Sequence, residues 1–486
     1  MIKKYLLCII GSILLSITYL ATVKTQRESS LWWSNLSVME KEISFRSEQG
    51  LYYSYFKEAV SLDSIFDAFE ALQHDNHTES PKKLNIFKRM NVLPEIILSI
   101  AYQKWFHYVK PIDFYEMSTI ILQFWTPFSL LFIMQSMNNS LLETLIFSAT
   151  FLLNNHAISR VVFALPLREN FGMPFWWLRT YGINLILQHI DTVFIQTSQK
   201  ILLWFGIAIF WLSTCLFCMF WQFSQFILLI EAVCMNILHY LEFINDKQCL
   251  IFSYCNLMSL GLTCLIQAGS LFPITSPCAA ILLSNMIFNG LKYFHKKDIN
   301  NHQVQDRRWL NIRSCIRCTE TLWGQVGFVV ILYGLFTVLN PNEDASHILQ
   351  FILHKFHLSD KWDFDTALYL CSQSFQHMDL EQYMMEIIGS KWILPSYAFG
   401  LVVLIKEMLS HYIGHKRIAN NRFIRLYKKL STEITQKSYT NLHEFRKKNE
   451  IHSLSRIQAW HLAYSFSFGF LAWSTVRMKY YGLHIC

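Results

Sequence analysis

The sequence has few charged residues for its length. Asp, Glu, Lys and Arg make up 16% of the 486 residues, whereas hydrophobic residues make up 53%. Soluble domains carry about 25% charged residues, so this deficit excludes an ordinary water-soluble fold. The 12 cysteines show no evenly spaced pairs, and Cys315 and Cys318 form a lone CxxC, so neither a disulfide framework nor a zinc site is predicted. P-loop, HExxH, GxSxG and dinucleotide-binding motifs are also lacking.

Long apolar runs are what the sequence does have. Residues 5–23 carry no charge and follow Lys3 and Lys4, which predicts a first transmembrane helix over residues 1–23 with a cytosolic N-terminus. A cleavable signal peptide is the alternative interpretation. Residues 24–110 are more polar and are predicted to form a lumenal loop with interfacial helices. This loop contains two N-glycosylation sequons, at Asn35 and Asn76.

Further apolar runs predict an all-α polytopic membrane protein of about ten or eleven spans. Residues 111–291 are predicted to form a transmembrane bundle, with uncharged runs at 117–142, 201–230 and 248–291 and an apolar run at 144–159. Pro273 and Pro277 are predicted to divide the longest run into two helices. Single transmembrane helices are predicted at residues 321–339, 392–408 and 457–476.

Loop charges predict the orientation. Residues 292–320 and 409–456 are rich in Lys and Arg, and both loops are expected in the cytosol by the positive-inside rule. Residues 340–391 carry several acidic residues and are expected in the lumen. The net charge of +8 therefore reflects topology, and nucleic acid is not a predicted partner.

Three segments carry candidate chemistry. Residues 40–55 place Glu42 and Glu48 beside a run of aromatic residues, where a carboxylate could act as a base; an interfacial helix with hydrated charges is the alternative. Residues 155–175 contain His156, Arg160 and Arg168, and arginine suits a lipid phosphate; a short loop with local pairing is the alternative. Residues 221–226 place two glutamines three apart on one predicted helical face.

These segments resemble a known family. EISFRSEQGLYYSYFKEAV, NHAISRVVFALPLRENFGMPF, WQFSQFILL and DFDTALYLCSQSF occur in the order seen in the dumpy-nineteen-type protein C-mannosyltransferases. The resemblance implies a GT-C glycosyltransferase fold in the endoplasmic reticulum membrane. It also implies mannose transfer from dolichyl-phosphate mannose to indole carbon 2 of tryptophan in W-x-x-W motifs of secretory and membrane proteins. No metal or cofactor is implied.

The resemblance also suggests roles for individual residues. GT-C enzymes carry a catalytic acidic residue in the first lumenal loop, so Glu48 is expected to be the base, with Glu42 as the second choice. Arg160 and Arg168 are expected to hold the donor phosphate, and His156 to contact donor or acceptor. Family members continue beyond the last segment found here, so the chain resembles a C-terminally truncated member. Whether this truncated chain is active stays open; a catalytically inactive scaffold is the alternative, for example one that anchors the acrosome at the inner nuclear membrane during spermatogenesis.

Overall fold

The protein is known from a computed structural model, which describes residues 2–45, 48–62, 64–78, 81, 83–137, 141–153, 161–162, 164–190, 197–241, 243–267, 269–301, 322–339, 402, 406 and 456–474. Within these residues the regular elements are helices, and the only extended pairing is an isolated bridge between Asp75 and Leu84. The chain forms two compact units. One comprises Met1–Val233 and Asp246–Tyr369, and the other comprises Cys234–Asn245 and Leu370–Cys486.

Four helical segments in the described part are long and apolar enough to cross a membrane. They are Leu6–Leu31, Pro111–Met137, Gln199–Phe220 and Asp246–Ile266. The first lies in α1 (Ile2–Leu31), and the second comprises α7 (Pro111–Leu122) and α8 (Trp125–Met137). Helix α1 packs along α8 and contacts α7, and α9 (Leu141–Leu153) joins them. The first unit is therefore built as a membrane-spanning helical bundle.

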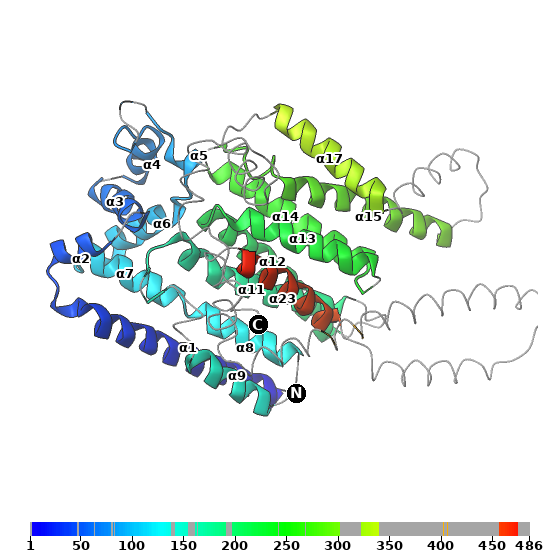
Figure 1. Ribbon diagram of the computed structural model, residues 1–486, viewed down its shortest axis with the longest axis horizontal. Helices are drawn as coiled ribbons and strands as arrows, with labels where there is room; N and C mark the ends of the chain where they lie inside the picture. Colours follow the sequence, from blue (N-terminus) through cyan, green and yellow to red (C-terminus); the bar gives the residue numbers. More distant parts are fainter. Residues whose placement is uncertain are drawn as a thin grey trace, which may run out of the picture. The chain divides into compact units, whose positions relative to one another are not determined.

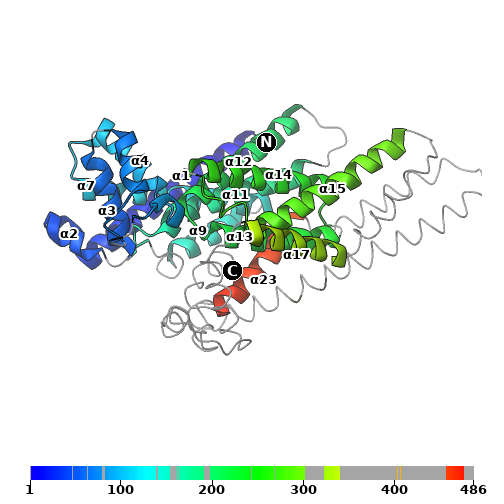
Figure 2. The same cartoon turned by 90° about the horizontal axis from the view of Figure 1, so that it is seen from above.

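Short helices cluster at one end of α1 and α7 (Figures 1 and 2). They are η1 (Trp33–Asn35), α2 (Val38–Ser44), α3 (Glu48–Ser61), α4 (Ile65–Gln73), α5 (Ile86–Arg89), α6 (Leu93–Ala101) and η2 (Tyr102–Phe106). Helix α3 packs against α6, α4 and α7. Its buried face is aromatic, with Tyr52, Tyr53, Tyr55 and Phe56 turned inward. Several short helices thus lie within residues 24–110, and α3 packs on three neighbouring helices.

Helices α11 (Arg168–His189) and α12 (Thr197–Phe220) pack closely on each other in the middle of the first unit. Small residues permit the approach: a Cβ added at Gly182 would lie 2.8 Å from the Phe210 nitrogen, and one added at Gly206 would lie 2.7 Å from the Leu185 Cβ. Helix α14 (Asp246–Ile266) lies against α12, and α15 (Pro277–Asn301) lies against α14 and α17 (Leu322–Leu339). Nearly all of α11 is buried.

The described part of the second unit consists of the end of α13 (Ser224–Tyr240) and α23 (Arg456–Ser474). The Cys234 thiol lies 3.3 Å from the Ser467 hydroxyl, so these two helices are in contact. Trp460 and Tyr464 pack on each other one turn apart on α23, with ring centroids 4.8 Å apart.

Described helices occupy several of the predicted segments. A helix covers the predicted first span and continues to Leu31, and helices occupy the runs predicted at 321–339 and 457–476. The run at 248–291 is divided where the prolines predicted it, and Pro277 begins α15. Residues 340–401, 403–405, 407–455 and 475–486 lie outside the described residues, as do Cys315 and Cys318 and all but two residues of the helix predicted at 392–408.

The structure differs from two expectations, the shared helical face of Gln222 and Gln225 and the loop that begins at residue 292. The uncharged run at 201–230 contains two helices, because α12 ends at Phe220 and α13 begins at Ser224. Gln222 lies in the turn between them and Gln225 in the first turn of α13, so the two glutamines do not share one helical face. The helix after Pro277 also extends through residues 292–301, into the region predicted as a loop.

Candidate active site

The three acidic residues within residues 40–55 have different environments. Glu40 is the third residue of α2 and forms a capping box with Ser37, whose backbone N–H donates to a Glu40 carboxylate oxygen at 2.7 Å. The hydrogen bonds from Ser37 hold the pKa of Glu40 below its usual value. Glu40 therefore acts as a helix cap, which leaves Glu42 and Glu48 as candidates for chemistry.

Glu42 is partly buried and has two partners on α3. The Lys57 ammonium donates to its carboxylate at 2.9 and 3.1 Å, and the Tyr53 hydroxyl donates at 3.3 Å. The same carboxylate and burial raise the pKa of Tyr53 well above its ordinary value. Glu42 thus connects α2 to α3, and this arrangement accounts for its position without a substrate.

Glu48 is the first residue of α3, and its side chain is exposed. A helix N-terminus favours a carboxylate, because the first backbone N–H groups point toward it. Tyr52 lies one turn later and is buried, and burial raises its pKa. Arg168 opposes that rise and Glu48 adds to it, so both charges act on the same phenol. Tyr52 therefore lies one turn after the predicted base, Glu48, and in contact with a predicted phosphate ligand, Arg168.

Arg168 begins α11 and is only 5% exposed. Its Nη2 donates to a Glu95 carboxylate oxygen at 2.5 Å, and the Tyr115 hydroxyl donates to the other oxygen at 2.8 Å. The guanidinium carbon lies 3.6 Å from the centroid of the Tyr52 ring, within cation–π range. Burial raises the pKa of Glu95, and the Arg168 guanidinium opposes that rise. Residues from α3, α6, α7 and α11 thus meet at one buried ion pair.

Two donor atoms of Arg168 are not used by this arrangement. Its Nε and Nη1 are buried and have no hydrogen-bond partner among the described residues. An unpaired buried N–H is costly, especially on a charged group, so these donors favour an anionic acceptor. Nε and Nη1 lie on different edges of the guanidinium, so each could donate to a separate acceptor oxygen while Nη2 keeps its bond to Glu95.

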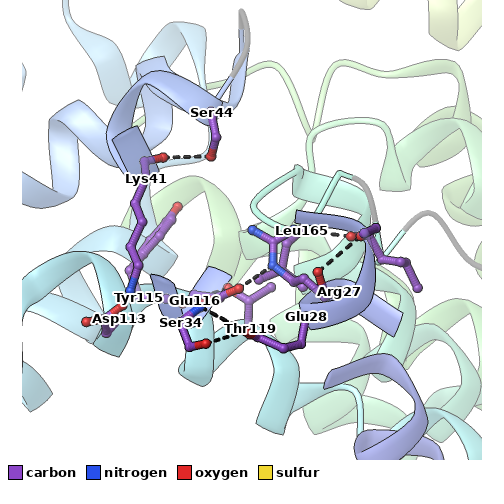
Figure 3. A network of polar contacts seen from close by, with 12 residues as sticks. Arg27, Glu28, Ser34, Lys41, Ser44, Asp113, Tyr115, Glu116, Thr119 and Leu165 are labelled. Atoms are coloured by element: carbon purple, nitrogen blue, oxygen red, sulfur yellow. Dashed lines mark hydrogen bonds and ion pairs between the residues drawn. The ribbon is translucent and has the colours of Figure 1, made fainter. Parts of the chain in front are cut away.

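The acidic face of α7 makes two further ion pairs close to α3. Lys41 Nζ lies 2.6 Å from Asp113 Oδ1, and Arg27 pairs with Glu116 through its Nε (Figure 3). The Arg27 Nη1 also donates to the Val162 carbonyl at 3.2 Å. Asp113 and Glu116 are three residues apart, so they share one face of the helix. This face therefore binds cations from both α1 and α2.

A second buried arginine on α11 has a complete set of partners. Arg179 pairs with Glu231 through Nη1 and donates from Nε to Thr214 and from Nη2 to Asn256, each at 3.1 Å. The Trp176 indole N–H donates to the other Glu231 oxygen at 2.9 Å. The network links four helices and supplies partners to a buried charge, which would otherwise be costly.

The remaining predicted positions are less connected. His156 and Arg160 lie outside the described residues, so only Arg168 of the predicted phosphate-binding residues has a described environment. Asn35 and Asn76 are both exposed. The Ser37 and Thr78 hydroxyls of their sequons are engaged, with Ser37 capping α2 and Thr78 2.9 Å from the Tyr55 hydroxyl.

Glu95, Tyr115 and Glu116 were not predicted from the sequence. A signal for the two acidic residues was present, since each interrupts an apolar run: Glu95 in NVLPEIILSIAY and Glu116 in DFYEMSTIIL. Acidic residues in such runs require a partner. Their pairing with Arg168 and Arg27 could not be read from the sequence, because the partners are 73 and 89 residues away.

Together, the apolar helices define a helical membrane protein, and its buried ion pairs lie both near α3 and between α11 and α13. Residues 13–486 match the Dpy19 family, described as Q-cell neuroblast polarisation, and the chain belongs to that family.

Curated relatives carry consistent names. The chain is 27% identical over 422 residues to human "Protein C-mannosyl-transferase DPY19L1". The aligned region covers 80% of this chain and 58% of the human protein. It is 23% identical over 407 residues to mouse "Probable C-mannosyltransferase DPY19L4", an alignment that covers 83% of this chain and 54% of the mouse protein. It is 24% identical over 415 residues to Caenorhabditis elegans "C-mannosyltransferase dpy-19", an alignment that covers 79% of this chain and 56% of the nematode protein. The chain thus spans somewhat more than half the length of these glycosyltransferases.

Proposed function

We propose that the chain is a protein C-mannosyltransferase of GT-C type in the endoplasmic reticulum membrane. The donor is dolichyl-phosphate mannose, and the acceptor is a tryptophan in a W-x-x-W motif of a secretory or membrane protein. The main support is the family match over residues 13–486, together with the contact between the Arg168 guanidinium and the Tyr52 ring at 3.6 Å, one helical turn after Glu48. A base and a phosphate-binding cation in one region suit this reaction.

The proposed reaction assigns each group one role. The bond between the mannose anomeric carbon and the phosphate oxygen breaks, and its electrons leave with dolichyl phosphate. Indole carbon 2 supplies the electrons of the new carbon–carbon bond, and Glu48 removes the proton from that carbon. Arg168, with Arg160, stabilises the charge on the departing phosphate, and His156 contacts donor or acceptor. The chain's own residues account for these steps without a cofactor.

The test compares the chain with its Glu48→Gln variant in cells that lack other C-mannosyltransferases. A thrombospondin-repeat reporter is analysed by peptide mass spectrometry for hexose on the W-x-x-W tryptophan. Because a general base contributes about 100-fold or more, the variant is expected to lose the hexose. Glu42→Gln is the matched control, since it removes one carboxylate from the same segment.

Three outcomes separate the alternatives. Loss of hexose in Glu42→Gln with retention in Glu48→Gln would transfer the role of base to Glu42. Hexose in both variants would reject a glutamate base in this segment. No hexose from the unmodified chain, while it is folded and glycosylated, would favour the scaffold function, with the inner nuclear membrane as the alternative location.

Exposure of residues 24–110 to the lumen is part of the same proposal. Asn35 and Asn76 are exposed, as N-linked glycans require. Glutamine at each position is expected to remove one glycosidase-sensitive mobility shift. If neither change alters the mobility and the unmodified chain carries no glycan, the segment does not face the glycosylation machinery.

A further inference from the structure

The chain between α1 and α3 forms a cluster of paired charges and stacked rings together with α7. We call Arg27, Trp33, Lys41, Asp113 and Glu116 the Trp33 clip. We propose that the Trp33 clip positions Glu48 for proton removal; this rests on the proposed function of Glu48 as the base. None of its members needs to touch substrate, so they are positioning residues.

Trp33 lies at the centre of the clip. The Arg27 guanidinium carbon is 4.5 Å from the centroid of its ring, and Lys41 Nζ is 5.1 Å from it. Both cations are buried, so these contacts are stronger than at an exposed surface. Each cation is also held from α7, Arg27 by Glu116 and Lys41 by Asp113 (Figure 3). The ring of Trp33 is thus fixed relative to a membrane-spanning helix.

Trp33 then fixes the end of α2. Its ring stacks on Phe45, with centroids 6.2 Å apart, and Phe45 meets the edge of Tyr53 at 5.5 Å. Phe45 is the C-cap residue directly after α2, and Glu48 begins α3 three positions later. The contacts of Phe45 with Trp33 and with Tyr53 therefore link α7, through Trp33, to one residue before Glu48 and one residue after it. Displacement of Trp33 would move the start of α3.

The backbone before Trp33 supports this interpretation. Trp32 has φ 51° and ψ 43°, a left-handed conformation that is rare for a bulky residue. The turn ends α1 and sends the next residue back into the protein, where Trp33 is buried while Trp32 is exposed. A strained residue persists only where the surrounding structure holds it, and here the clip supplies that constraint.

The indole nitrogen of Trp33 provides a conservative variant. Nε1 is buried and has no hydrogen-bond partner among the described residues. The ring faces, and not the N–H group, therefore carry the contacts. Trp33→Phe keeps an aromatic ring between the two cations, whereas Trp33→Ala removes it. We expect Trp33→Phe to retain mannose transfer and Trp33→Ala to lose it.

The experiment uses Glu116→Gln, Trp33→Ala, Trp33→Phe and the control Glu231→Gln in the purified full chain. Glu231→Gln is matched because it also neutralises the acid of a buried Arg–Glu pair, but on elements outside the clip. Transfer is measured with dolichyl-phosphate mannose and a W-x-x-W peptide that carries hydrogen or deuterium at indole carbon 2. Amide hydrogen exchange is measured over residues 48–52.

In Glu116→Gln and Trp33→Ala, we expect kcat to fall about tenfold or more, because small displacements of a reacting group are costly. The acceptor KM should change less than twofold. The deuterium isotope effect on kcat should increase, since a displaced base makes proton removal limiting. Amide exchange in the first turn of α3 should rise. Trp33→Phe and Glu231→Gln should keep the unmodified isotope effect and exchange.

Unchanged isotope effect and unchanged exchange in Glu116→Gln and Trp33→Ala would overturn the inference. Equal changes in Glu231→Gln would also overturn it, since they would show a general loss of packing. If the unmodified chain transfers no mannose, the proposed function fails. The exchange measurement then still decides whether the clip orders the start of α3.

Discussion

Helix α11 carries two buried arginines, Arg168 at its start and Arg179 three turns later, and each pairs with a buried glutamate. Each glutamate also accepts a hydrogen bond from a neutral aromatic donor, Tyr115 for Glu95 and Trp176 for Glu231. The arginines differ in their other donors. Every guanidinium nitrogen of Arg179 has a described partner, whereas two nitrogens of Arg168 have none among the described residues.

This difference separates a structural network from one that can bind a ligand. A buried polar network whose donors are all paired rigidifies the helices that it joins, and a ligand could gain little from it. Unpaired buried donors carry a free-energy cost that an anionic ligand would remove. The Arg179 network is therefore expected to determine stability, and the Arg168 network to determine donor binding.

The largest expected effect is on stability at Arg179. Arg179→Met leaves the Glu231 charge buried without its cation, which is expected to lower the free energy of unfolding by about 3–5 kcal/mol. Thermal unfolding of the chain in detergent measures this loss, and transfer per folded molecule should stay close to that of the unmodified chain. If Arg179→Met kept its stability and bound the donor more weakly, the assignment of stability to the Arg179 network and of donor binding to the Arg168 network would be wrong.

The second effect is on donor affinity at Arg168. The double change Arg168→Gln with Glu95→Gln removes both charges together, so no unpaired charge stays buried and stability should change little. Loss of charge-assisted hydrogen bonds worth about 1.5–3 kcal/mol should weaken dolichyl-phosphate mannose binding roughly 10- to 100-fold. Titration calorimetry with the donor measures this change.

The matched control for the second prediction is Arg179→Gln with Glu231→Gln. It removes the same charges from the same helix and should keep the donor affinity of the unmodified chain. Equal loss of affinity in both double variants would mean that the donor depends on α11 as a whole. Unchanged affinity in the Arg168 variant would reject Arg168 as a phosphate ligand.

Parts of this comparison could be predicted from the sequence. Arg168 and Glu48 can be proposed from the sequence because they stand in segments that combine charge with aromatic or apolar residues. The division of residues 248–291 could be predicted because proline removes a backbone donor. The break at 221–223 carries neither charge nor proline, so hydropathy could not show it. The Arg179–Glu231 pair depends on tertiary packing between α11 and α13, which no local pattern reports.

The smallest expected effect concerns Tyr115, and it tests whether the Glu95 carboxylate is ionised in the folded protein. Tyr115→Phe removes one hydrogen bond to Glu95 and should lower the free energy of unfolding by about 1 kcal/mol, since Arg168 stays in place. The phenol favours the charged carboxylate, so its loss raises the pKa of Glu95 beyond the rise that burial already causes.

The sign of the pH dependence follows from this shift. The lost hydrogen bond matters only where Glu95 is ionised in the folded chain, so the destabilisation should be fully present above the raised pKa of folded Glu95 and shrink as the pH falls through it. Unfolding midpoints of the unmodified chain and of Tyr115→Phe, compared from pH 4 to pH 8, measure the difference. A difference that stays constant over this range would show that Glu95 does not titrate there. A difference that grows toward low pH would mean that Tyr115 favours the protonated acid, and Arg168 would then lack the counterion on which its comparison with Arg179 depends.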